Sequence, residues 1–169
     1  EMQHLVDFAQ TYLAGRSEKD VWINEGLSSA AEYLYEGAHV QDRIDYFDAD
    51  PTGSIALGNN FLVWDGYWEN TAPYDTLANY STVYLFFQWL RIHASNGAGI
   101  YKEILASSSA NYQAVTGPAA SRISQDYSFW YKMLRDWMLA NLLARPTGLT
   151  AYEGEIAPAA GVFASTGRP

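Results

Sequence analysis

Apolar residues recur every three or four positions along several stretches of the chain, and this spacing predicts amphipathic helices. The predicted helices cover residues 1–15, 21–35, 41–49, 75–93, 100–106 and 126–144. Gly15, Gly37 and Pro146 mark the ends of three of them, as is typical where helices stop. No segment alternates strictly between apolar and polar positions, as a half-buried strand would. The pattern therefore predicts a mainly α fold.

The first and the last of these helices have wide apolar faces. Leu5, Phe8 and Tyr12 share one side of the first helix, and Trp137 and Met138 belong to a broad face of the last helix that we expect to be buried. Burial of apolar surface stabilises a fold by ~25 cal/mol per Å², and 49% of the chain is hydrophobic. At 169 residues, the chain is therefore expected to form one domain with its own core.

Glycine, asparagine and proline interrupt the helical pattern between residues 50 and 74, where aromatic residues lie in a long loop. These aromatic residues are Phe61, Trp64, Tyr67 and Trp68. A loop of this length inside a compact domain is usually functional or packed on itself. After Pro146 the chain is rich in alanine, glycine, threonine and proline. We therefore expect a helical domain over residues 1–145 and a tail or linker over residues 146–169.

The charge and composition of the chain exclude some classes of function. The formal net charge is −9, and the ten lysines and arginines are scattered singly, so the sequence has no basic patch for nucleic acid. No apolar run approaches the ~20 residues that a membrane span needs. Cysteine is absent, which excludes disulfides and cysteine-ligated zinc. Aromatic residues, 15% of the chain, suit a core and also a groove that binds peptides or glycans.

Candidate chemistry lies at the start of the chain. Glu1 and His4 have the spacing of the last two functional residues in the H-E-x-x-H motif, where both histidines bind zinc and the glutamate polarises a metal-bound water. One helix face cannot complete a tetrahedral zinc site, so a further ligand must come from a neighbouring helix. Glu25 lies 21 positions after His4, near the start of the second predicted helix. Two helices joined by a short turn pack antiparallel, which would bring Glu25 toward the middle of the first.

These two segments together resemble a known class of enzyme. E-M-Q-H at residues 1–4 and W-I-N-E-G-L-S at residues 22–28 are similar to the gluzincin metallopeptidases. They look closest to the hyicolysin-like bacterial peptidases, in which the second helix carries W-L-N-E-G-L-S. The stretch A-N-Y-S-T-V-Y-L-F-F at residues 78–87 resembles the third helix of that group, and the match covers residues 1–36 and about 74–92. The resemblance implies the helical C-terminal lobe of a zincin-like zinc peptidase.

The resemblance also implies a role for each residue of the two motifs. His4 would be the second zinc ligand, and Glu25 would be the third. Glu1 would be the general base, which takes a proton from a zinc-bound water as the water attacks a peptide carbonyl. Asn24 and Ser28 would hold the ligands in place.

Gluzincins also need a donor that stabilises the tetrahedral oxyanion, commonly a tyrosine or histidine from a later helix or loop. We predict that Tyr80 is this donor, with Tyr84 and Tyr74 as the next candidates. Glu32, two turns beyond the predicted carboxylate ligand, is either a hydrogen-bond acceptor for the zinc-binding imidazole or a solvated surface residue. The other histidines are expected at the surface; they are His39 and His93.

The chain departs from the family pattern at its first residue, because the histidine that precedes the glutamate in the motif is absent. Two protein ligands hold zinc more weakly than three, so we expect weak or absent zinc binding and little or no peptidase activity from the chain as given. The intact parent would be the enzyme, acting on peptides or proteins. The resemblance implies a secreted or cell-envelope bacterial protein. Apolar surface exposed by the truncation would favour dimerisation.

Two other functions stay open. In the first, the chain is a non-catalytic helical module whose aromatic loop binds a peptide or glycan, and the motif residues are incidental. In the second, the parent is an aminopeptidase, because W-x-N-E-G also occurs in gluzincin aminopeptidases. A histidine encoded before Glu1 would complete the zinc motif, and so would separate a peptidase from the binding module.

Overall fold

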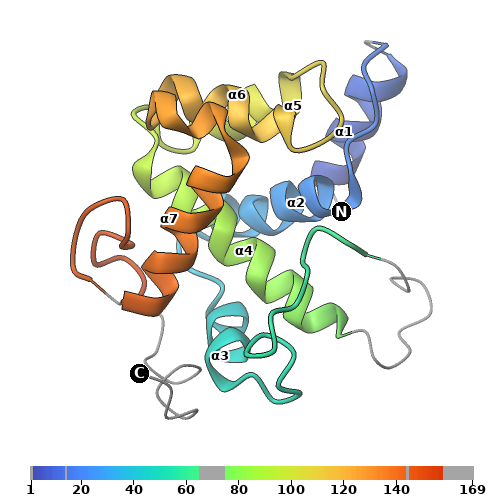
Figure 1. Cartoon of the computed structure of the whole chain (residues 1–169). Helices are drawn as coiled ribbons and strands as arrows, with labels where there is room; N and C mark the ends of the chain where they lie inside the picture. Colours follow the sequence, from blue (N-terminus) through green and yellow to red (C-terminus); the bar gives the residue numbers. More distant parts are fainter. Residues whose placement is uncertain (1, 14, 65–74, 144, 158–169) are drawn as a thin grey trace.

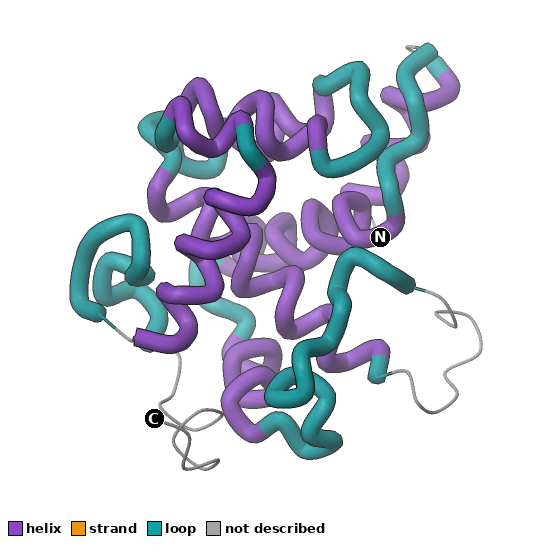
Figure 2. Tube along the Cα trace, viewed as in Figure 1, coloured by secondary structure: helices purple, strands orange, loops and turns teal. Residues whose placement is uncertain are grey.

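The computed structural model describes residues 2–13, 15–64, 75–143 and 145–157. Within these ranges the chain is mainly helical and contains no β-strand, so the predicted fold class is confirmed (Figure 2). The helices are α1 (Met2–Tyr12), α2 (Val21–Glu36), α3 (Gln41–Ala49), α4 (Thr76–His93), α5 (Gly99–Ala106), α6 (Gln113–Arg122), the 3-10 helix η1 (Gln125–Ser128) and α7 (Trp130–Leu143). Helix α6 contains Gly117 and Pro118, which usually mark a turn, so the apolar pattern does not predict it.

Helix α4 lies at the centre of the fold, in contact with α2, α3, α5 and α7, whereas α1 packs against α2 and α5 (Figure 1). Every residue from 81 to 90 is buried. The ring of Phe86 is surrounded by six aromatic side chains with centroids 5.3–6.3 Å away, namely Trp22, Phe61, Phe87, Trp89, Trp130 and Trp137. Such pairs add ~0.5–1.5 kcal/mol each beyond simple burial. The aromatic residues of the sequence therefore supply the core that joins α2, α4, α7 and the long loop.

Helix α2 approaches α4 closely at Gly26. A methyl group built on Gly26 would overlap three ring carbons of Phe87, the farthest of them at only 2.8 Å. Phe87 is fully buried, so its ring has no space into which it could move. Only glycine therefore allows this separation between the two helices, and the separation sets the position of the neighbouring residue, Glu25.

Helix α1 packs with its polar side inward. Asp7 is only 4% exposed and His4 is half-buried, whereas Leu5, Phe8 and Tyr12 are 68%, 56% and 67% exposed. The apolar face of the first predicted helix thus lies on the surface of the described part of the molecule. The polar contacts of α1 with α2 are those of His4 with Asn24 and Glu25. None of the described helices is long and apolar enough to cross a membrane.

The described part of the long loop, residues 50–64, is held in a defined shape by hydrogen bonds. The carboxylate of Asp50 accepts from the backbone N–H groups of Ile55 (3.0 Å) and Ala56 (2.8 Å). The indole N–H of Trp64 donates to the carbonyl of Phe61 at 2.8 Å. The loop is therefore packed on itself, as its length predicts. Two of its predicted aromatic residues, Tyr67 and Trp68, lie outside the described residues.

The segment of residues 145–157 returns to the core, although the sequence predicts that a tail or linker begins at residue 146. Tyr152 is 1% exposed, and its hydroxyl donates to Asn141 Oδ1 (2.8 Å) and accepts from Trp137 Nε1 (3.1 Å). Ile156 is also buried. The packed core therefore extends past residue 146, and residues 158–169 lie outside the described part.

A polar network ties this C-terminal segment to the interior. The Nε2 atom of His39 lies 3.6 Å from Glu155 Oε2, and its Nδ1 atom lies 3.1 Å from the hydroxyl of the fully buried Tyr84. Arg91 pairs with the same Glu155 carboxylate and covers the ring of Tyr33 at 4.3 Å. His39 was expected at the surface, but it is half-buried because it links the loop after α2 to the C-terminal segment.

We predict that Gly26→Ala lowers the free energy of unfolding by about 1–3 kcal/mol, the usual cost of overpacking a core. Gly117→Ala in α6 is the matched control, because a methyl group there meets no atom within 4 Å and alanine favours a helix over glycine by up to ~1 kcal/mol. Chemical denaturation of both variants measures the difference. Equal stability of the two variants would show that α2 and α4 are not in close contact at Gly26.

We also predict that Glu155→Gln lowers the pKa of His39 further. Burial already holds that pKa below its ordinary value, Arg91 lowers it as well, and Glu155 opposes both. Because the folded state favours the neutral ring, the stabilisation from His39 is present above pH 6.5 and is lost as the pH falls through the lowered pKa. NMR titration of the His39 ring protons measures the shift. Glu153→Gln, in the same segment, should leave it unchanged, and a higher pKa in Glu155→Gln would contradict the network.

Candidate metal centre

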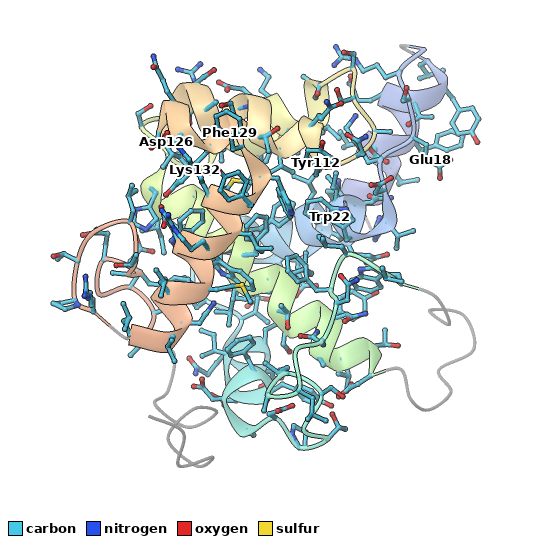
Figure 3. The ribbon with its side chains drawn as sticks, in the orientation of Figure 1. Glu18, Trp22, Tyr112, Asp126, Phe129 and Lys132 are labelled. Atoms are coloured by element: carbon cyan, nitrogen blue, oxygen red, sulfur yellow. The ribbon has the colours of Figure 1, made fainter. Side chains whose placement is uncertain are left out.

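The connection between α1 and α2 is anchored to the segment that joins α5 and α6. Lys19, 4% exposed, donates from Nζ to the carbonyl of Ser107 (2.8 Å), and the backbone N–H of Asp20 donates to the carbonyl of Ala110 (2.9 Å). Asp20 directly precedes α2, so these bonds fix where that helix starts. Figure 3 shows Trp22 directed from the first turn of α2 toward the interior, whereas Glu18 lies beside α1 at the outer edge.

This arrangement brings together three polar side chains from α1 and α2. The Nδ1 atom of His4 lies 3.1 Å from Asn24 Oδ1, and its Nε2 atom lies 3.8 Å from Glu25 Oε2. The Glu25 side chain is only 9% exposed, and that of His4 is 31% exposed. The structure therefore places the imidazole and the carboxylate at one point between two neighbouring helices.

The distances and the hydrogen bond suit a shared cation. With Asn24 Oδ1 as the acceptor, Nδ1 of His4 carries the proton, so the Nε2 atom of the neutral ring presents a lone pair near the carboxylate oxygen of Glu25. A separation of 3.8 Å is too long for a hydrogen bond. Zinc lies about 2.0–2.2 Å from nitrogen and oxygen ligands, so two of its ligand atoms are about 3.4 Å apart in tetrahedral geometry and at most about 4.3 Å apart. The two donors therefore fit a single zinc ion.

Asn24 has the position expected of a residue that orients a metal ligand. Histidines that bind a metal through one ring nitrogen usually donate the other N–H to an oxygen acceptor, which fixes the tautomer and the direction of the ring. Asn24 precedes Glu25 directly in the chain, so the same turn of α2 supplies both the carboxylate and the group that aims the imidazole. Asn24 thus makes the contact with His4 that its predicted supporting role requires.

A second pair of charged groups lies near His4. Neither of the two sequence motifs that resemble the zinc peptidases indicates this pair. Asp7 and Lys19 are each 4% exposed. Burial raises the pKa of Asp7, opposed by the charge of Lys19, and burial lowers the pKa of Lys19, opposed by Asp7. Asp7 lies three residues after His4 and therefore on the same side of α1, a spacing visible in the sequence. Lys19 gives no such signal, because it lies in the connection between helices.

Some of the residues predicted for the site lie outside the described part of the chain, and for another the predicted role is not tested by its contacts. Glu1, the predicted general base, and Tyr74 are not among the described residues. Ser28 is half-buried on α2, four residues beyond Asn24. Its role in holding the ligands stays a prediction.

The other predicted residues lie along α4 and at the far end of α2. The ring of Tyr80 meets Trp64 edge-on at 5.1 Å and lies under the guanidinium of Arg43 at 4.8 Å. Its role as oxyanion donor stays a prediction. Tyr84 is fully buried beside His39, and burial raises its pKa to about 12. Glu32 lies 3.8 Å from Arg43 with its side chain 45% exposed, which favours the surface interpretation of this carboxylate.

A complete metal site would need at least one ligand more than the described residues provide. Among the described residues, no group of three or more histidine, aspartate or glutamate side chains is placed to hold a metal ion. Catalytic zinc sites commonly use three protein ligands and leave one position for water. The pair of His4 and Glu25 therefore has the chemistry of part of such a site.

Comparison with known proteins supports this interpretation at the level of a broad class. The chain is 29% identical over 156 residues to the neutral metalloprotease ShpI of Staphylococcus hyicus. The alignment covers 91% of this chain but 34% of that protein, so the chain spans about a third of the length of this relative. No family model matches the chain. The similarity supports a relationship to metallopeptidases.

We predict that Asn24→Ala weakens zinc binding by about 10–100-fold, the usual effect of removing a group that orients a metal ligand. His4→Gln and Glu25→Gln should weaken it more, because each removes a ligand atom. Glu32→Gln is the control, since that carboxylate lies on the same helix and pairs with Arg43. Competition with a chromophoric zinc chelator measures the affinities of the longer protein and its variants. Equal zinc affinity in the Glu25→Gln and Glu32→Gln proteins would contradict the assignment.

Proposed function

We propose that the chain is part of a zinc-dependent peptidase of the gluzincin class, similar to the hyicolysin-like enzymes. The observation that carries this proposal is the 3.8 Å approach of His4 Nε2 to Glu25 Oε2 from two separate helices, with Asn24 on the other ring nitrogen. The similarity to a neutral metalloprotease along most of the chain supports it independently.

Zinc would supply the Lewis acid that brings the pKa of a bound water down to about 7. The side chains of this chain would hold that ion and aim the reaction. His4 donates its Nδ1 proton to Asn24, which keeps the lone pair of Nε2 directed toward Glu25. Glu25 is buried, and partial exclusion of water strengthens the attraction of a carboxylate to a cation.

Two parts of the proposed site come from the resemblance and lie outside the described residues. The remaining histidine ligand would precede Glu1 in the longer protein, and Glu1 would accept the proton of the attacking water. Tyr80 is the proposed oxyanion donor. It lies near the start of α4, and a change in its contacts with Trp64 and Arg43 on substrate binding would be part of that role.

The proposed activity belongs to the longer protein. The chain spans about a third of the length of its metalloprotease relative, so a cleft formed with other parts of the polypeptide would contribute to substrate binding. The exposed apolar face of α1, carrying Leu5, Phe8 and Tyr12, is a surface suited to such packing. We propose that peptides or unfolded proteins are the substrates.

Hydrolysis of fluorescently labelled casein by the longer protein tests the proposal. Glu1→Gln should retain zinc and lose about 10²–10⁴-fold in kcat/KM, the usual contribution of general acid–base catalysis. Glu25→Gln should lose both zinc and activity. Glu36→Gln, an exposed carboxylate at the end of α2, should keep both. The proposal fails if a zinc chelator leaves hydrolysis unchanged, or if Glu25→Gln is as active as Glu36→Gln.

A further inference from the structure

Two neighbouring depressions lie beside the loop of residues 50–64, and none of their lining residues belongs to the candidate metal centre. The first has a volume of about 290 Å³ and lies between this loop, α3 and α7. Its apolar walls include Phe47, Phe61, Leu62, Leu134, Trp137 and Met138. No ionisable side chain is among the described residues that line it, although the chain has a net charge of −9.

The second depression, of about 380 Å³, adjoins the first. Gly58, Asn59 and Asn60 line both of them. The walls of the second are more polar and include Asn79 and the carboxylate of Asp75. Asp75 is its only ionisable side chain among the described residues. The two adjoining depressions, together called the groove below, are apolar and uncharged at one end and polar with a negative charge at the other.

Packing among the described residues does not explain the exposed apolar atoms at the first depression. The sequence predicts that Met138 is buried with the rest of its helix face, but it is 56% exposed. It lies at the wall of the cavity next to the buried Trp137. Concave apolar sites of about 300 Å³ or more, with a few polar groups at their edges, are typical of ligand-binding pockets.

Hydrogen bonds hold the walls of the groove in place. Asn59 Nδ2 donates to Asn79 Oδ1 (3.0 Å) and to Thr82 Oγ1 (3.3 Å), which attaches the shared loop to α4. Asn141 in the apolar wall is held by its bonds to Trp137 and Tyr152. A ligand that enters such a site does not have to order its walls, so less of the interaction energy is lost.

We propose that this groove binds an extended peptide segment that has a large uncharged side chain next to a basic residue. The apolar cavity accepts an aromatic or branched aliphatic side chain, because its lining offers no partner for a charge. The asparagine side chains at the shared rim can bond to peptide amide groups. The carboxylate of Asp75 accepts hydrogen bonds from Tyr46, Thr52 and the N–H of Ala78. Its charge and the net charge of −9 still favour a cation over an anion at the other end.

The proposal goes beyond the peptidase function and does not require catalysis. As a site apart from His4 and Glu25, the groove would recognise part of a polypeptide without cutting it there. A glycan is the competing ligand, because asparagines and tryptophan also bind sugars. The cavity favours a peptide side chain, since seven of its twelve lining residues are apolar and sugars require many more hydrogen-bonding partners.

Binding of four small probes to the chain, followed by NMR of its ¹⁵N-labelled form, tests the proposal. The probes are N-acetyl-Lys-Phe-Lys-amide, N-acetyl-Glu-Phe-Glu-amide, N-acetyl-Lys-Gly-Lys-amide and the disaccharide chitobiose. We expect the Lys-Phe-Lys probe to bind at least tenfold more tightly than either of the other peptides. The largest shifts should occur at the indole N–H of Trp137 and at the side-chain amides of Asn59, Asn60 and Asn141.

Met138→Gln should weaken binding of the Lys-Phe-Lys probe at least threefold, because the substitution removes apolar contact without adding charge. Tyr131→Gln is the matched control: Tyr131 lies on the same helix, is 64% exposed and does not line the cavity. Tighter binding of chitobiose, equal binding of the Phe and Gly probes, or shifts confined to other residues would each overturn the proposal. So would the absence of saturable binding. Loss of peptidase activity in the longer protein would leave it unaffected.

Discussion

The close contact between α2 and α4 is the constraint on which the candidate site depends. At Gly26 the two helices approach so closely that a single methyl group would collide with the buried ring of Phe87. Glu25 is the preceding residue, so this contact fixes how deeply its carboxylate is buried and toward which helix it points. Trp22, one turn earlier, anchors the same helix in the aromatic core through Phe61, Phe86 and Trp130. A buried carboxylate is costly unless a cation or donors compensate it, and the side chain of Glu25 is only 9% exposed.

Helix α1 has the opposite relation to the core. Its polar residues His4 and Asp7 face α2, while Leu5, Phe8 and Tyr12 face outward. An ordinary surface helix places its apolar stripe inward. In α1 the apolar stripe instead stays exposed within the described part of the chain. The orientation delivers the imidazole to Glu25 and leaves an apolar face for another surface. The orientation of α1 therefore determines both the position of the His4 ligand and the exposure of the apolar face of α1.

Much of the fold and part of the site could be predicted from the sequence. The helical periodicity predicted six of the helices. Asp75 directly precedes the apolar pattern of α4, a position that suits a cap, and its carboxylate accepts from the N–H of Ala78 at 3.0 Å. The meeting of His4 and Glu25 was predictable because short connections make adjacent helices antiparallel. The inward side of α1 was not, since a hydrophobic pattern alone indicates burial of Leu5 and Phe8. The burial of Lys19 and Tyr152 was not predicted either, because it depends on partners elsewhere in the sequence. Lys19 bonds to Ser107, and Tyr152 bonds to Asn141 and Trp137.

The His4–Glu25 pair is the element that connects this fold to the proposed chemistry, and locating a bound metal ion tests it most directly. Anomalous diffraction at the zinc absorption edge, from crystals of the longer protein grown with zinc, gives the position of the ion without reference to activity. The account predicts one dominant peak within about 2.3 Å of both His4 Nε2 and Glu25 Oε2, with Asn24 still bonded to Nδ1. A peak bound by other residues, or a direct hydrogen bond between His4 and Glu25 with no ion between them, would contradict it.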